Sequence, residues 1–224
     1  MWLQGLLEAI YPTRCAGCDL PGWLLCAGCR AAIEAMMPPD TCPRCGAPHG
    51  ALTCTECWEI EFAFTQAACV GSLARPLSRI VTMYKDGGEV RLAQVAAGLL
   101  AENLEAWQTW PHAIVAIPAS SKAVARRGFD HVELIAQRIS DAWAVPSLKP
   151  LESSALKDQR LLGRSARKTN TAEAIRVSSD VRLPERILLL DDVITTGATV
   201  DAAASALIAA GATEVRVGAL ARAW

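Results

Sequence analysis

The chain has 224 residues, of which 52% are hydrophobic, and its formal net charge is −1. This length allows one good domain with a small appendage, and this hydrophobic content is ample for a buried core. A charge near zero excludes a general attraction to nucleic acid or to an acidic membrane, so such binding requires a local basic patch. No apolar run approaches the roughly twenty residues that span a bilayer, so we expect no membrane insertion.

The first ten residues carry apolar side chains at helical spacing, among them Trp2, Leu6 and Ile10. They lack the basic start and the small-residue cleavage site of a signal peptide. We therefore predict a docking helix at this end of the chain.

Eight of the nine cysteines form four Cys-x-x-Cys pairs within the first 57 residues. The pairs are Cys15 and Cys18, Cys26 and Cys29, Cys42 and Cys45, and Cys54 and Cys57. Four thiolates complete a tetrahedral structural zinc site, so the eight predict one or two structural zinc ions, with sequential or interleaved pairing. Disulfides and an iron–sulfur cluster are the alternatives. Because metal-binding thiols fit a reducing compartment, we expect a cytoplasmic location.

The composition changes near residues 60–66, from a Cys-, Pro- and Gly-rich start to apolar runs that alternate with helical stretches. We predict an N-terminal helix and double zinc ribbon over residues 1–62, and a larger domain over residues 63–224. Strands are expected over 67–74, 113–117, 187–190 and 214–220, and helices over 90–107, 129–143 and 199–210. This alternation, with right-handed crossovers, predicts an α/β fold with a mostly parallel sheet and helices on both faces.

The strand over 113–117 leads into a short loop with two hydroxyls and a cation, Ser120, Ser121 and Lys122. Backbone amides and these side chains can bind pyrophosphate, with Arg126 and Arg127 close behind. Taken alone, the loop is better explained as a plain strand-to-helix turn. The binding interpretation gains its support from a second ligand loop near residue 191.

Residues 157–170 hold five cations and a single acid, Asp158. The cations are Lys157, Arg160, Arg164, Arg167 and Lys168. A solvated helix face and a basic flap over a polyanion both explain this pattern, and the polyanion would be pyrophosphate or a nucleic-acid backbone. Trp107, Trp110 and Trp143 offer surfaces on which single-stranded bases can stack, although packing in a core or an interface is the commoner role.

The segment over 187–199 joins a buried apolar strand to an alanine-rich helix through Asp191, Asp192 and a turn rich in Thr and Gly. In parallel α/β sheets ligands bind beyond the carboxyl ends of the strands, and a helix N-terminus offers N–H groups to phosphate. The two carboxylates can accept hydrogen bonds from vicinal ribose hydroxyls. We expect the rest of the segment to bind the same ligand, at Val193, Thr195, Thr196, Gly197, Ala198 and Thr199, with the turn from Thr195 to Thr199 meeting the phosphate. An ordinary strand end with an acidic turn is the alternative, whereas a Walker loop is excluded because no Gly-Lys-Ser/Thr follows.

This segment resembles the signature by which type I phosphoribosyltransferases bind phosphoribosyl pyrophosphate (PRPP). Together the motifs resemble the ComF family, competence-associated proteins with a double zinc ribbon and a phosphoribosyltransferase-like domain. The resemblance covers about residues 6–222 and includes the cysteines, the Tyr84-Lys85 segment, Arg126 to Phe129, Gln159 to Asn170 and the loop at Asp191. It departs at Asp130-His131, where Asn-Gln is common, and before Gln159, where an expected Arg is missing.

The resemblance implies a cytoplasmic role in competence and natural transformation, in which incoming single-stranded DNA is passed to DNA-uptake or recombination proteins. It also implies binding of PRPP with Mg²⁺, to which Lys85 would contribute. Two interpretations stay open. One is a DNA-handling factor with little or no enzymatic activity. The other is an active phosphoribosyltransferase that uses Asp191 and Asp192 to transfer ribose 5-phosphate to a base or an amine, although no segment obviously builds a hood for that acceptor. An adaptor with a vestigial loop is a third, weaker interpretation.

Overall fold

The computed structural model describes residues 12–36, 40–47, 50–153, 175–179 and 181–223. The helix predicted over the first ten residues and the basic segment over 157–170 lie outside this set. Within the described residues, no helix has both the length and the apolar character needed to cross a membrane.

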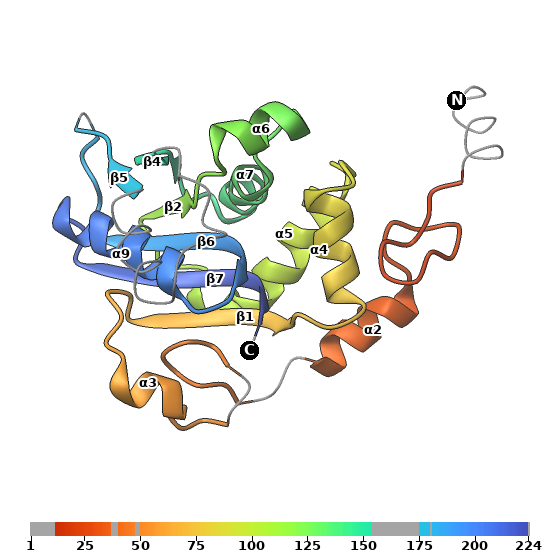
Figure 1. Ribbon diagram of the computed structural model, residues 1–224, viewed down its shortest axis with the longest axis horizontal. Coiled ribbons are helices and arrows are strands. Elements are labelled where there is room, and N and C mark those ends of the chain that lie inside the picture. Colours follow the sequence, from red (N-terminus) through yellow and green to blue (C-terminus); the bar gives the residue numbers. More distant parts are fainter. Residues whose placement is uncertain (1–11, 37–39, 48–49, 154–174, 180, 224) are drawn as a thin grey trace, which may run out of the picture.

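A parallel five-stranded sheet forms the centre of the molecule (Figure 1). Its strands, in spatial order, are β1 (Gln66–Ser72), β7 (Glu214–Arg222), β6 (Arg186–Ile194), β2 (Ala113–Ala116) and β3 (Ser147–Leu148). Each neighbouring pair is parallel. Two short strands, β4 (Leu151–Ser153) and β5 (Ile175–Val177), form a separate antiparallel pair. The predicted, mostly parallel sheet is confirmed.

Helices cover both faces of the sheet, as the sequence predicted. The described helices around it are α4 (Leu77–Lys85), α5 (Leu92–Asn103), α6 (Ser121–Arg127), α7 (His131–Trp143) and α9 (Ala198–Ala209). Successive residues of a strand point to opposite faces. Accordingly, Leu188 and Leu190 of β6 enter the core shared with α4, α5 and α7, whereas Ile187 and Leu189 enter the core under α9. All four side chains are fully buried, which explains the uninterrupted apolar run.

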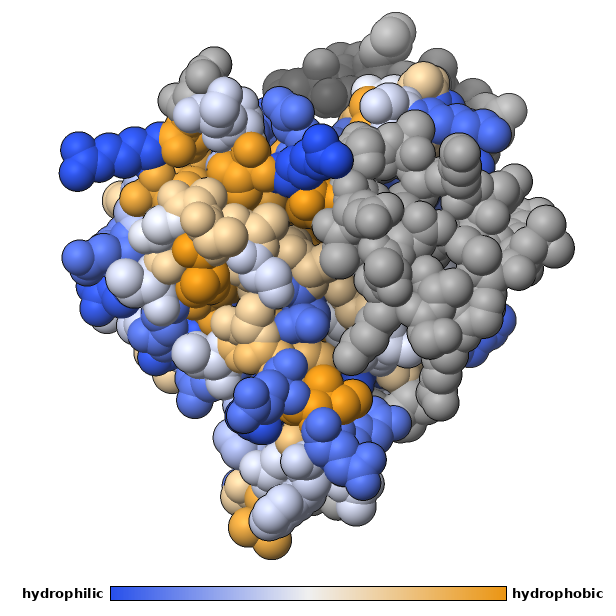
Figure 2. All heavy atoms as spheres, turned by 60° about the vertical axis from the view of Figure 1, so that its left-hand side comes forward, coloured by the Kyte–Doolittle hydropathy of each residue, from blue (hydrophilic) through white to orange (hydrophobic). Residues whose placement is uncertain are grey.

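The outward side of α9 is built mainly from alanines that are partly exposed, such as Ala202 and Ala206, or exposed, such as Ala209. The side of the molecule on which α9 lies comes forward in Figure 2, where pale apolar surface is bordered by hydrophilic side chains. The helix is therefore apolar nearly all round, although only one side of it enters the core.

Several element boundaries differ from the prediction. β6 continues past the apolar run to Ile194, because Asp191 and Val193 still pair with β7. The helix expected over 90–107 ends at Asn103 and is followed by the 3₁₀ turn η1 (Glu105–Trp107). The short helices α4 and α6 were not predicted.

The first cysteine module (Cys15, Cys18, Cys26 and Cys29, with α2, Ala27–Met36, which contains Cys29) packs on α4 and, through α2, on β1. The guanidinium of Arg79 in α4 donates to the carbonyl oxygens of Cys15 and Ala16, at 3.0 and 2.8 Å. Ile33 of α2 is fully buried within the core that contains α4.

The second cysteine module (Cys42, Cys45, Cys54 and Cys57, with α3, Thr55–Glu59) occupies a different place, beside β1 (Figure 1). Gly46 has φ +70°, and a β-carbon there would lie 2.8 Å from the carbonyl oxygen of Ala67 in β1. Glycine is therefore required both by the left-handed backbone and by the close approach to the strand.

After β2 and β6 the chain continues toward opposite edges of the sheet. These strands are neighbours, but the chain continues from β2 toward β3 and from β6 toward β7. In open parallel sheets this reversal of strand order is where ligands bind, beyond the carboxyl ends of the strands. Both predicted ligand loops lie at this position.

Candidate functional site

Each cysteine module brings four sulfur atoms within 4.8 Å of one another. The sulfurs of Cys18 and Cys26 are 3.7 Å apart, and those of Cys45 and Cys54 are 3.6 Å apart. Four sulfurs at about 2.3 Å from one zinc ion would be separated by about 3.8 Å, so both groups fit a tetrahedral site. All nine cysteines lie in the described part of the chain and have free thiols. The pairing is therefore sequential, and the disulfide alternative is not supported.

Backbone N–H groups approach sulfurs in both modules. Cys26 N–H donates to the sulfur of Cys15 and Cys54 N–H to that of Cys42, each at 3.3 Å. Burial alone would raise these thiol pKa values, but the N–H groups outweigh it and lower the pKa of Cys15 to about 6 and that of Cys42 to about 7. Thiolates are the form that binds metal, so each module contains a sulfur prepared for zinc.

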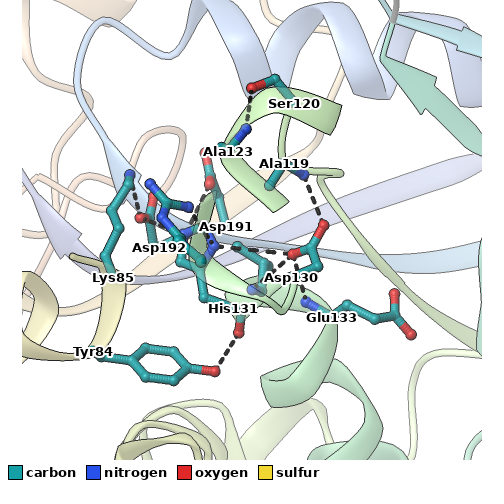
Figure 3. A network of polar contacts seen from close by, with 12 residues as sticks. Tyr84, Lys85, Ala119, Ser120, Ala123, Asp130, His131, Glu133, Asp191 and Asp192 are labelled. Atoms are coloured by element: carbon teal, nitrogen blue, oxygen red, sulfur yellow. Dashed lines mark hydrogen bonds and ion pairs between the residues drawn. The ribbon is translucent and has the colours of Figure 1, made fainter. Parts of the chain in front are cut away.

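Asp192 is the centre of a buried polar network at the end of β6 (Figure 3). Its Oδ2 accepts from Nζ of Lys85 at 2.5 Å and contacts Nε2 of His131 at 2.8 Å. Burial disfavours the charged carboxylate, but the hydrogen bond from His131 and the positive charge of Lys85 outweigh it. The pKa of Asp192 therefore lies well below its usual range, and the group is a fixed anion.

His131 is held from both sides of its ring. Nη1 of Arg127 lies 3.2 Å from Nδ1, and because a guanidinium only donates, Nδ1 must accept. The proton of a neutral ring then lies on Nε2 and is donated to Asp192. The Tyr84 hydroxyl also donates to the His131 carbonyl oxygen at 2.6 Å. The ring thus connects α6 to the end of β6.

Asp130 connects the loop after β2 to the start of α7. Its Oδ1 accepts from the N–H groups of Val132 and Glu133, which caps α7. Its Oδ2 accepts from Ala119 N–H at 2.8 Å. Since an Asp at the N-cap satisfies otherwise unpaired N–H groups, one side chain fixes both a helix start and a predicted ligand loop.

Asp191 has the opposite electrostatic environment to its neighbour, although it keeps partial exposure. Burial and then repulsion from Asp192 raise its pKa well above the usual range, and the Asp192 N–H, which donates to Oδ1 at 2.8 Å, only partly offsets this. A carboxylate in this environment is suited to hydroxyl donors or a cation.

The phosphate loop (residues 195–199) follows directly. Thr195, Thr196 and Thr199 are exposed, while Gly197 is buried with φ +79° and begins α9 without a side-chain cap. Of these three threonines, only Thr196 has a hydroxyl hydrogen-bonded to the N-terminus of α9, where it accepts from Ala198 N–H at 3.4 Å. The first turn of a twelve-residue helix is thus open to an anion.

The remaining predicted site residues that the structure describes lie in or beside α6. Ser120 caps α6 by accepting from Ala123 N–H at 3.3 Å, and Ser121 and Lys122 are exposed at the start of that helix. Arg126 and Arg127 lie 3.7 and 3.6 Å from Asp86, respectively. The other predicted flap cations are outside the described residues: Arg160, Arg164, Arg167 and Lys168.

Two tryptophans considered for base stacking face a cation instead. The guanidinium of Arg216 lies 4.1 Å from the ring centre of Trp110 and 5.4 Å from that of Trp107. Arg216 belongs to β7 and pairs with Glu214 at the amino end of that strand, opposite the phosphate loop.

The chain is similar in sequence to several known proteins. The chain is 30% identical to the DNA utilization protein YhgH of Escherichia coli K12, over 94% of this chain and 97% of that protein. The chain belongs to the ComF/YhgH family. The family also contains the competence protein ComFC of Streptococcus pneumoniae, 29% identical over 88% of this chain and 87% of that protein, and competence protein F of Haemophilus influenzae, 29% identical over 89% and 90%. The predicted resemblance to ComF is confirmed. No protein-family model matches the chain.

Among solved structures, this ComF/YhgH chain is similar to a purine phosphoribosyltransferase from Pyrococcus horikoshii, with a TM-score of 0.41 and 19% identity over 59% of this chain and 75% of that one. It is also similar to an orotate phosphoribosyltransferase from Aeropyrum pernix, with a TM-score of 0.40 and 17% identity over 66% and 78%. At these TM-scores the similarity carries no functional argument.

Proposed function

We propose that this ComF/YhgH-family protein binds PRPP at residues 191–199 and handles single-stranded DNA in the cytoplasm. The observation that carries the proposal is the charged Asp192, held by Lys85 and His131 at the end of β6, directly before the open N-terminus of α9. A fixed carboxylate beside a phosphate-binding helix end is suited to a ligand with hydroxyls at one side and phosphate at the other.

In this proposal each part of PRPP meets a different group. Asp191 and Asp192 accept hydrogen bonds from the ribose hydroxyls, and the phosphate loop holds the 5-phosphate. The exposed Lys122 and Ser121 supply a cation and a hydroxyl for the pyrophosphate. We expect Mg²⁺ to accompany PRPP and to reduce its charge. The partly exposed Asp191, whose own charge is disfavoured, is the side chain most suited to such a cation.

The DNA-handling part of the proposal rests on the names of the relatives and on the basic segment of the sequence. Similar proteins are called competence and DNA utilization proteins. We assign the contact with the DNA backbone to the basic flap and to Arg126, whose side chain is 69% exposed. Arg127 is only 9% exposed and contacts His131, so we assign it to positioning that ring rather than to DNA.

The test is fluorescence anisotropy of a short labelled single strand with the zinc-loaded protein, over a salt series, with and without Mg²⁺ and PRPP. We expect salt-dependent binding that PRPP changes, because phosphate contacts release counterions. Replacing Arg164, Arg167 and Lys168 by Gln should reduce both the affinity and the salt slope. Absence of binding at low salt, or no effect of the three replacements, would contradict the DNA assignment.

A second candidate function is catalytic transfer of ribose 5-phosphate from PRPP to a base or an amine. The paired carboxylates and Lys122 favour it, because such transfer needs stabilisation of a positively charged ribose and of a departing pyrophosphate. Pyrophosphate release should be measured with PRPP and a panel of nucleobases and amines. Release that disappears in Asp191→Asn/Asp192→Asn would support an enzyme, and release no faster than background with every acceptor would count against one.

A further inference from the structure

The aromatic ring of Phe62 lies between the second cysteine module and the phosphate loop. Phe62 packs against the buried cysteines of that module. A β-carbon on Gly197 would be 3.2 Å from Cε1 and 3.4 Å from Cζ of the same ring. The ring therefore covers the one residue of the loop that combines burial with a positive φ.

A hydrogen bond strengthens this connection. The backbone N–H of Ala63 donates to Oδ1 of Asp201 at 2.8 Å, across 138 positions of sequence. Asp201 lies in the first turn of α9, so the segment after the second module holds the start of the helix as well as the loop before it.

Two further contacts join the second cysteine module to the sheet and to the core under α9. The ring of Phe62 stacks on that of Phe64, with centroids 4.7 Å apart and planes at 16°. Phe64 is 4% exposed and belongs to the core under α9. At the end of β7, the buried guanidinium of Arg222 lies 3.8 Å from Glu56 of α3. Arg222 is opposite Ile194 in the sheet, so the second module also reaches the strand end from which the loop departs.

We propose that Phe62 is a positioning residue through which the second cysteine module holds the phosphate loop in its binding conformation. Glycine loses more conformational freedom on ordering than any other residue, and the neighbouring threonines are exposed. The stacked ring and the Ala63–Asp201 bond restrict that freedom before a ligand arrives, which lowers the entropic cost of binding. In the part of the chain that the structure describes, the first cysteine module packs on α4 and, through α2, on β1, rather than on the phosphate loop.

The effect of Phe62 on PRPP binding rests on the proposed function, but its effect on the order of the phosphate loop does not. The primary test is therefore hydrogen–deuterium exchange of backbone amides over residues 193–201 in the full-length, zinc-loaded protein. Phe62→Ala should make these amides exchange about tenfold faster, because local opening is no longer opposed by the ring. Phe62→Leu, which keeps an apolar contact, should have a smaller effect and covers the case in which the alanine variant folds poorly.

Trp58→Ala is the matched control. Trp58 is an aromatic residue of the same module, but it is 77% exposed and donates its indole N–H to Thr53 within the module. The Trp58→Ala substitution should leave amide exchange over residues 193–201 unchanged. Unchanged loop exchange in both Phe62 variants, or equal acceleration by Trp58→Ala, would overturn the proposal.

Zinc binding provides an independent arm. Cys54→Ser in the second module should accelerate exchange over 193–201, whereas Cys18→Ser in the first module should accelerate it around α2 and α4 and leave 193–201 unchanged. Equal acceleration of the loop by both would indicate general destabilisation and overturn the inference.

Titration with PRPP and Mg²⁺ then separates this inference from the proposed function. If wild type binds PRPP, Phe62→Ala should bind it about tenfold more weakly, a difference of about 1.4 kcal/mol. Equal affinity of the two proteins would overturn the positioning role. If wild type does not bind PRPP, the proposed function fails, while faster loop exchange in Phe62→Ala would still support the mechanical connection.

Discussion

Asp191 and Asp192 are adjacent and chemically identical, yet their environments shift their pKa values in opposite directions. The hydrogen bond from the His131 ring and the charge of Lys85 lower the pKa of Asp192, whereas burial and then the like charge of Asp192 raise the pKa of Asp191. The difference arises because alternate residues of a strand face different neighbours. One carboxylate is therefore stabilised as an anion in the folded protein, whereas the charge of the other is disfavoured and is relieved by a proton or by a ligand.

This difference predicts opposite effects on stability. The raised pKa of Asp191 means that its stabilising contribution is complete below the ordinary value of 3.8 and is lost as pH rises through the folded-state pKa. Asp191→Asn should therefore raise the unfolding free energy at neutral pH, by about 1 kcal/mol or about 2–4 °C. The gain should be greater at pH 8 than at pH 5 in thermal unfolding curves.

Asp192→Asn should lower the unfolding free energy. Because its pKa is depressed, the contribution of Asp192 is present above the ordinary value of 3.8 and is lost only as pH falls through the lower folded-state pKa. The variant should therefore be less stable than wild type throughout the range from pH 6 to pH 8. An Asp192→Asn protein as stable as wild type over that range would contradict the network described for this residue.

His131 gives a second prediction at this scale. His131→Leu removes the N–H given to Asp192 and the acceptor used by Arg127, so the free energy of unfolding should fall by about 2–3 kcal/mol. His131→Gln can restore one of the two bonds and should cost less. Urea unfolding of both variants provides the measurement. A loss as large for Gln as for Leu would show that the hydrogen bonds are not the cause.

Sequence motifs predicted Asp191, Asp192 and the phosphate loop because they are contiguous in the chain. The same approach identified Asp130-His131 only as a departure from the family pattern. The contact between His131 and Asp192 spans 61 positions, and no local pattern predicts which helix start meets which strand end. The buried position of His131 became evident only from the packing of α7 on the sheet.

Among the elements, β6 shows why strand length was underestimated. The apolar run ends at Leu190, but pairing with β7 continues to Ile194 because the ladder depends on backbone groups, not on side-chain polarity. The short helix α6 was missed for a different reason. α6 has no buried residue and seven residues in all, which is too short for a clear helical period.

The start of α7 supplies the prediction at this scale. Asp130→Ala removes a helix cap and the partner of Ala119 N–H, so the unfolding free energy should fall by about 1–2 kcal/mol. Ser120→Ala is a suitable control, because it removes one longer cap bond and should cost about 0.5 kcal/mol. Chemical denaturation of the two variants checks the order, and an equal loss would contradict the double role of Asp130.

At the scale of the whole molecule, the α/β class and the two groups of cysteines follow from periodicity and spacing. The places at which the modules attach do not. They depend on contacts such as that of Arg79 with Cys15 and that of Gly46 with Ala67, which join segments without a shared local pattern. The division of the chain at residues 62 and 63 stays a prediction.

Sequential pairing predicts the metal content. The purified protein should contain two zinc ions, and Cys45→Ser should weaken one while leaving the other in place. Cys69 is buried outside both groups, and burial raises its thiol pKa to about 12, so Cys69→Ser should keep both ions. Elemental analysis together with titration by a chelator gives the stoichiometry. One ion per chain, or a loss of both in Cys45→Ser, would contradict two independent sites.

Isothermal titration calorimetry with PRPP and Mg²⁺ measures directly whether residues 191–199 bind PRPP. We expect one site per chain in the zinc-loaded wild type, and binding at least about tenfold weaker in Asp191→Asn/Asp192→Asn, a loss of about 1.4 kcal/mol or more. Trp58→Ala serves as the control and should bind as wild type does. No heat of binding in wild type, or unchanged affinity in the double variant, would contradict PRPP binding at this site.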